Sequence, residues 1–109
     1  VMAHNRDDHS KNFTFLMNEF GEWKLSPAYD LTFSSGPGGE QSTMVMGEGR
    51  NISIKHLIKL GLEAKLSKEF VENVIEQTRS SLAKWMNLSK DFGISNSNRE
   101  LIQKVISKV

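Results

Sequence analysis

The chain has 109 residues, the length of one domain or of one lobe of a larger protein. Its 14 basic and 13 acidic residues give a net charge of +1, which argues against nucleic-acid binding driven by bulk charge. The sequence has no cysteine, so disulfides, thiolate zinc sites and cysteine nucleophiles are excluded. No stretch approaches the ~20 apolar residues of a membrane-spanning helix, and no secretory signal opens the chain. We therefore expect a cytoplasmic protein with no membrane partner.

A dense polar cluster follows the first few residues of the sequence. It reads Arg6-Asp7-Asp8-His9-Ser10-Lys11-Asn12. Two apolar residues, Val1 and Met2, open the chain ahead of it, whereas natural N-termini are usually loose. This start looks like a cut through the middle of an element, and we expect the chain to be a fragment of a longer protein.

A short β-hairpin is predicted over residues 13–25. Two aromatic and β-prone runs flank Asn18-Glu19-Phe20-Gly21, which is typical of a hairpin loop. Pro27 ends the second strand, because proline cannot donate to a sheet ladder. Residues 26–50 then carry most of the glycines. We expect a glycine-rich loop there that is either a mobile linker or a substrate-facing segment.

Residues 51–109 are predicted to form helices that supply the core. Ser53 or Asn51 can cap a first helix, which ends at or near Gly61. Ser67 is a plausible N-cap of a second, long helix.

The second helix is predicted to run on through Leu82 and Trp85, because apolar residues recur there at helical spacing, and to stop at Gly93. Ser95 or Ser97 caps a last helix. The fold class expected for the single region 1–109 is therefore mainly α with a short β-hairpin.

The spacing from Asp7 to Asn12 reproduces part of a protein-kinase catalytic loop, R-D-x-x-x-x-N. In kinases the Asp accepts the proton of the substrate hydroxyl, or orients that hydroxyl, and the Asn binds Mg²⁺. Asp30 stands directly after the predicted hairpin, where a second metal-binding carboxylate is required. Because the hairpin returns the chain, we expect Asp30 to face Asn12 across a metal ion.

Oxygen donors of this kind suit Mg²⁺, which is a hard cation that keeps several of its waters. Lys11 can neutralise charge on a transferring phosphoryl group. The alternative is ordinary loop capping, in which Asp and Asn side chains bond nearby backbone groups. A zinc-type site from His4, Asp8 and His9 lacks a fourth ligand at sensible spacing.

Two strings that contain these residues resemble the HipA family of bacterial serine/threonine kinase toxins: N-R-D-D-H-S-K-N-F-T-F-L and W-K-L-S-P-A-Y-D-L-T-F-S. The resemblance extends over essentially the whole chain and is strongest in residues 5–34. It implies a fold related to the phosphatidylinositol-kinase branch, in which this chain would be a kinase-like C-lobe fragment. Within it, residues 1–12 would be the catalytic loop, 13–25 the hairpin, 26–50 the metal-Asp segment with the glycine-rich loop, and 51–109 the helices.

The resemblance also implies roles for individual residues. Asp7 would be the catalytic residue, and Asn12 and Asp30 would bind the metal. The nucleotide-binding residues that it implies are His9, Lys11, Asn12, Tyr29 and Asp30.

The function implied is a toxin kinase that uses ATP and Mg²⁺ to phosphorylate a protein serine or threonine, with growth arrest and persistence as its consequence. Family members pair with a HipB-like helix-turn-helix antitoxin, through which alone they contact DNA, and they can phosphorylate glutamyl-tRNA synthetase. The N-terminal lobe that covers the phosphates has no counterpart here, because Gly36-Pro37-Gly38-Gly39 matches no phosphate-binding loop and follows Asp30. We therefore expect the fragment alone to be inactive. A non-catalytic helical interaction module, or a small-molecule or lipid kinase of the related branch, is the alternative.

Overall fold

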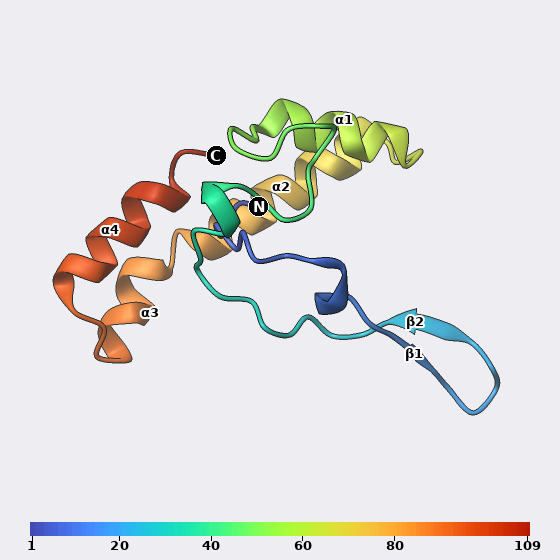
Figure 1. Cartoon of the computed structure of the whole chain (residues 1–109), viewed down its shortest axis with the longest axis horizontal. Helices are drawn as coiled ribbons and strands as arrows, with labels where there is room; N and C mark the ends of the chain where they lie inside the picture. The colour runs from blue at the N-terminus through green and yellow to red at the C-terminus, as the bar shows by residue number, and fades with distance from the viewer.

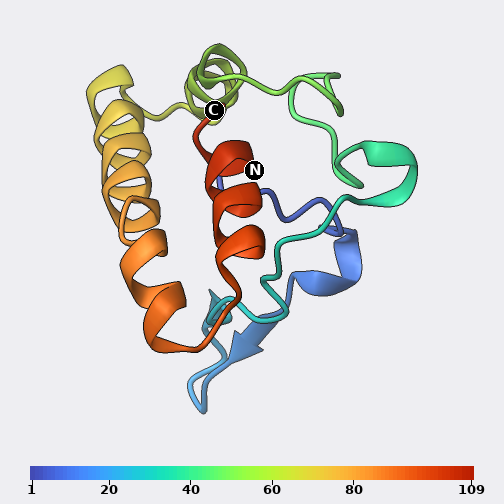
Figure 2. The same ribbon diagram turned by 90° about the vertical axis from the view of Figure 1, so that its left-hand side faces the viewer.

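The chain divides into a loop-rich first half that carries one hairpin and a second half of four helices (Figure 1). The computed structural model describes all of residues 1–109. Figure 2 shows the helices on the left and in the centre, with residues 1–50 to the right and below them. None of these helices combines the length and the apolar content that crossing a bilayer requires.

The predicted hairpin is confirmed, with β1 (Phe15–Met17) and β2 (Trp23–Leu25) paired antiparallel. Its turn is held by Asn18, whose Oδ1 accepts the backbone N–H groups of Phe20 and Glu22 at 3.0 Å each. All six strand residues are exposed, and the hairpin projects away from the helices (Figure 1). β2 ends at Leu25, just before Ser26 and Pro27, as the proline predicts.

The first helix, α1 (Ile54–Glu63), begins at Ser53, one of the two predicted caps. The backbone N–H of Ser53 donates to Nδ1 of His56 at 3.0 Å, so a histidine takes the place of the usual Glu in a reciprocal cap. The helix ends at Glu63, two residues beyond Gly61, so the predicted end near Gly61 is confirmed although Gly61 itself lies inside the helix. Gly61 is buried because Val71 of the next helix packs directly on it. The glycine marks a close helix contact and not a helix end.

The second predicted helix is two helices, α2 (Lys68–Leu82) and α3 (Trp85–Asp91). Its predicted start is confirmed, because Oγ of Ser67 accepts the backbone N–H of Phe70 at 3.2 Å. The break at residues 83–84 was not predicted. Nε1 of Trp85 donates to the carbonyl oxygen of Arg99 at 3.1 Å, which directs α3 against α4 (Asn96–Ile106). The helix thus breaks at a point where the sequence periodicity continues.

The ends of the last two helices follow the prediction. Gly93, with a φ of 71°, terminates α3, and the N–H of Ile94 reaches back to the carbonyl of Ser89 at 3.0 Å. This is the hydrogen bond of a Schellman motif. Oγ of Ser95 then accepts the N–H of Asn98 at 3.4 Å and caps α4.

The apolar core is small for a chain of this size. Met2 from the first segment packs with Val71 and Ile75 of α2, and partly buried side chains of α1 and α2 surround them. The chain exposes 8044 Å², whereas a compact protein of 12.3 kDa exposes about 6,100 Å². A mostly apolar cavity of about 880 Å³ lies between the segment after the hairpin and the helices, lined among others by Leu31, Phe70 and Val74. The helices thus leave much of their apolar surface uncovered.

We expect Gly61→Ala to destabilise the domain, although alanine normally stabilises a helix over glycine by about 1 kcal/mol. The new Cβ would lie 2.3 Å from Cγ2 of Val71, so α1 and α2 would have to separate. The free energy of unfolding, measured in urea, should fall by about 1–3 kcal/mol. In the double variant Gly61→Ala/Val71→Ala the two losses should be less than additive, because the smaller side chain makes room. A more stable Gly61→Ala protein would contradict this packing.

Candidate functional site

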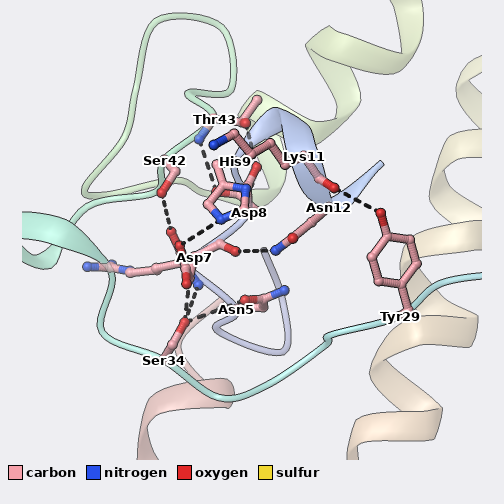
Figure 3. A network of polar contacts seen from close by, with 11 residues as sticks. Asn5, Asp7, Asp8, His9, Lys11, Asn12, Tyr29, Ser34, Ser42 and Thr43 are labelled. Atoms are coloured by element: carbon pink, nitrogen blue, oxygen red, sulfur yellow. Dashed lines mark hydrogen bonds and ion pairs between the residues drawn. The ribbon is translucent and has the colours of Figure 1, made fainter. Parts of the chain in front are cut away.

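The predicted catalytic loop has no regular structure from residue 6 to residue 9 and then closes in a short 3-10 turn, Ser10–Asn12. Nδ2 of Asn12 donates to the backbone carbonyl of Asp7 at 2.9 Å (Figure 3). Since a carbonyl can only accept, this bond fixes the orientation of the Asn12 amide and leaves its Oδ1 without a partner in the loop. An uncommitted amide oxygen is the kind of donor that Mg²⁺ takes.

Asp7 is held by its main chain and not by its side chain. Its backbone N–H donates to Oγ of Ser34 at 3.1 Å, and its carbonyl accepts from Asn12. Its carboxylate is 55% exposed, and the His9 imidazole lies beside it, with Nε2 3.8 Å from Oδ1. The structure thus places Asp7, His9 and Asn12 together, with the Asp7 carboxylate accessible from solvent.

Tyr29 ties the segment that follows the hairpin back to this turn. Its hydroxyl donates to the carbonyl of Lys11 at 2.9 Å (Figure 3). The same hydroxyl lies 2.6 Å from Oγ1 of Thr14. The hydroxyl is therefore engaged within the protein, and only the ring is left for the predicted contact with a nucleotide. The role of Tyr29 as a nucleotide-binding residue stays a prediction.

Asp30 follows Tyr29 in a left-handed conformation, with a φ of 53°, and is exposed. Lys11 is exposed as well. The Tyr29 contact brings the start of this segment to the 3-10 turn, but no hydrogen bond or ion pair joins Asp30 to Asn12. That the two side chains share one metal ion stays a prediction.

The glycine-rich loop packs against the catalytic loop, and neither predicted alternative, a mobile linker or a substrate-facing segment, included this contact. Ser42 donates both its backbone N–H and its hydroxyl to the carbonyl of Arg6, at 3.0 Å each. Gln41 and Thr43 on either side of it bond to the backbone and the carboxylate of Asp8 and to the carbonyl of Asn5.

Arg6 lies between the two loops. Its guanidinium donates to the carbonyl oxygens of Gly39 and, at 2.8 Å, Arg50. Arg6 thus supports the catalytic loop through main-chain carbonyls of the glycine-rich loop. The backbone at Gly36 lies so close to Arg6 that a Cβ added to the glycine would be 2.6 Å from Cβ of Arg6. Arg50 in turn pairs with Glu40, with Nη2 and Oε1 3.0 Å apart.

His4 precedes the site and stacks on Phe33, with ring centroids 5.2 Å apart. Partial burial, reinforced by the charge of Arg6, lowers the pKa of its imidazole below the usual value. No group of three or more His, Asp or Glu side chains is placed to hold a metal ion. Asp8 in particular is committed to the glycine-rich loop.

Sequence reasoning missed the residues that hold the two loops together: Ser34, Gln41, Ser42, Thr43 and Arg50. The one available signal was the polar run Gln41-Ser42-Thr43 inside a glycine-rich segment, which offers donors where a plain linker needs none.

The comparisons with known proteins bear on the whole of this region. A family model described as HipA-like C-terminal domain matches residues 1–105. No curated protein and no solved structure matches the chain. The match spans the catalytic loop, the hairpin, the glycine-rich loop and all four helices, and the chain therefore belongs to the HipA-like C-terminal domain family.

Proposed function

We propose that this chain is the kinase-like C-lobe of a HipA-type serine/threonine protein kinase, and that it carries the catalytic and metal-binding residues. The observation that supports this most directly is the loop from Asp7 to Asn12. Its main chain is tied at several points, while the Asp7 carboxylate and the Asn12 amide oxygen remain free. A rigid backbone with uncommitted side-chain oxygens is what positioned acid–base and metal chemistry needs.

In the proposed reaction, Asp7 accepts the proton of a serine or threonine hydroxyl. The hydroxyl oxygen bonds to the γ-phosphorus of ATP, the bond from that phosphorus to the bridging β–γ oxygen breaks, and ADP leaves. His9, whose Nε2 lies 3.8 Å from Asp7 Oδ1, would hold the carboxylate in position and lie beside the phosphates. Lys11 would compensate phosphate charge, and the Tyr29 ring would lie against the nucleotide.

Asn12 Oδ1 and the Asp30 carboxylate would hold the Mg²⁺ that accompanies ATP. One amide oxygen and one carboxylate, both without protein partners, fit the preference of this ion for oxygen ligands completed by phosphate and water. When bound, the ion would neutralise the charge that gathers on the phosphates.

The N-terminal lobe would come from the rest of the intact protein, since both sides of the phosphates need positioning groups. The uncovered apolar surface and the large cavity support further protein packing on this chain. Implied partners are a HipB-like antitoxin, with DNA contacted only through it, and a protein substrate, for which glutamyl-tRNA synthetase is the first candidate. The compartment proposed is the cytoplasm.

The same apolar surface favours a second function, a helical interaction module without catalysis. A small-molecule or lipid kinase is the other alternative. Identifying the acceptor that carries radiolabelled phosphate distinguishes it from the first proposal.

The 109-residue chain alone should show no phosphate transfer from radiolabelled ATP, and ATP should bind to it weakly. Transfer depends on groups from both sides of the phosphates, and one side is not among these residues. The matched control is the intact HipA-type protein in the same assay. Transfer by the isolated chain at a rate close to that of the intact protein would contradict the division of the site between two lobes.

In the intact protein, Asp7→Asn should lower the transfer rate by about 100-fold or more, in the range expected for loss of a general base. The melting temperature should stay unchanged, because Asp7 is fixed through its backbone and its carboxylate is mostly exposed. Asp91→Asn on α3 is the matched control for loss of one exposed carboxylate. Normal transfer by Asp7→Asn would show that Asp7 is not the general base. A lower melting temperature would show that Asp7 supports the fold.

Asp30→Asn should raise the Mg²⁺ concentration needed for ATP binding by the intact protein, and by more than Asn12→Ala does. A carboxylate neutralises the cation, whereas an amide offers only a dipole. Asparagine is the suitable replacement because it tolerates the left-handed backbone at Asp30. A magnesium titration of nucleotide binding measures the effect. Curves that overlay the wild type for both variants would show that these residues do not form the metal site.

A further inference from the structure

We infer that Asp8 is a positioning residue that clamps the glycine-rich loop and thereby sets the direction of the Asp7 carboxylate. This inference rests on the proposed function, because Asp7 is the base only within it. Asp8 is half-buried next to an exposed Asp7, so two adjacent carboxylates lie in different surroundings.

Both carboxylate oxygens of Asp8 are occupied by the loop. Oδ1 accepts the backbone N–H of Thr43 at 3.0 Å, and Oδ2 accepts Nε2 of Gln41 at 3.0 Å. The hydroxyl of Thr43 adds a third bond, to the Asp8 carbonyl, at 2.7 Å (Figure 3). Asp8 is thus held by its side chain and its main chain together, which makes it unsuitable as the proton acceptor and leaves that role to Asp7.

Gln41 completes the clamp from the other side. It is 6% exposed, and Nε2 donates to the carbonyl of Asn5 at 2.6 Å as well as to Asp8. Both amide hydrogens are therefore used, and they join the backbone at residue 5 to the carboxylate at residue 8. Loss of the Asp8 acceptor would leave a donor of Gln41 buried and unpaired, which proteins avoid.

The clamp matters for Asp7 because the backbone on both sides of it is fixed by these loops. Ser34 Oγ accepts the N–H groups of Arg6 and Asp7 at 3.0 and 3.1 Å, and Ser42 holds the Arg6 carbonyl. Asp8 fixes the backbone on the C-terminal side of Asp7. If Asp8 is released, residues 8 and 9 can rotate. Ser34 and Asn12 still hold the N–H and the carbonyl of Asp7, so the release loosens only the C-terminal side of Asp7 and lets its carboxylate reorient. A misplacement of about 1 Å costs about 100-fold in rate.

The test compares Asp8→Asn, Thr43→Val and Thr43→Ser in the intact HipA-type protein. Asparagine offers one acceptor oxygen and presents an NH₂ group to a second donor, so one of the two carboxylate bonds is lost. We expect kcat of Asp8→Asn to fall by about 10-fold or more, with little change in the KM for ATP. Thr43→Val loses the hydroxyl bond and should show a smaller fall in kcat. Thr43→Ser keeps both donors and should match the wild type.

The outcomes separate this inference from the proposed function. If the wild type transfers phosphate and both Asp8→Asn and Thr43→Val keep its kcat, the clamp is wrong and the proposed function stands. If kcat falls only together with the melting temperature and the affinity for ATP, Asp8 supports the fold and the positioning role is wrong. If Asp7→Asn stays active while Asp8→Asn is inactive, Asp8 is the base. If the wild type transfers no phosphate to any acceptor, the proposed function fails and the positioning role fails with it. If Asp8→Asn does not fold, the comparison of kcat between Thr43→Val and Thr43→Ser tests the clamp instead. These two variants differ in the hydroxyl that bonds the Asp8 carbonyl.

Discussion

The contact between residues 5–8 and residues 39–43 holds the first half of the chain together. Neither segment forms regular structure, so their backbone polar groups need partners from elsewhere. They supply them to each other through Ser42, Gln41 and Thr43 on one side and Arg6 and Asp8 on the other. The backbone on either side of Asp7 depends on this pairing of two irregular segments, together with the bonds that Ser34 and Asn12 make to Asp7 itself.

The helical second half is stabilised mainly by apolar packing, and this packing leaves part of the apolar surface uncovered. α1 and α2 share a small apolar core with Met2, and α3 packs on α4 through the Trp85 contact with Arg99. Much apolar surface of α2 and of the segment after the hairpin stays open. Hydrogen bonds therefore position the polar site accurately, while the helical body is left with a surface suited to further packing.

Local signals in the sequence predicted local structure well. Ser67 and Ser95 cap helices, Pro27 follows the strand, and the hairpin forms where aromatic residues flank a polar turn. The break at residues 83–84 was missed, because the apolar periodicity continues through Trp85 and does not contain the contact of Trp85 with Arg99.

The family was predictable because its motifs are contiguous strings, and the match over residues 1–105 confirms it. The spacing of Asp7, Asn12 and Asp30 along the chain was equally readable. The docking of Gln41 and Thr43 on Asp8 was not, since it joins positions more than 30 residues apart with no period to reveal it. Whether Asp30 meets Asn12 across a metal ion stays a prediction.

The distances along the chain between the anchors also bear on the order of folding. The partners of Arg6 include Ser34, 28 residues later, and Arg50, 44 residues later. Contacts over that separation carry a larger loop-closure entropy cost than the local contacts of a helix or a hairpin, and they tend to form later. Residues 5–12 can take up their final geometry only after residue 50 has been added and the glycine-rich loop has folded back. The polar site thus precedes most of its anchors along the chain and is a late event in folding.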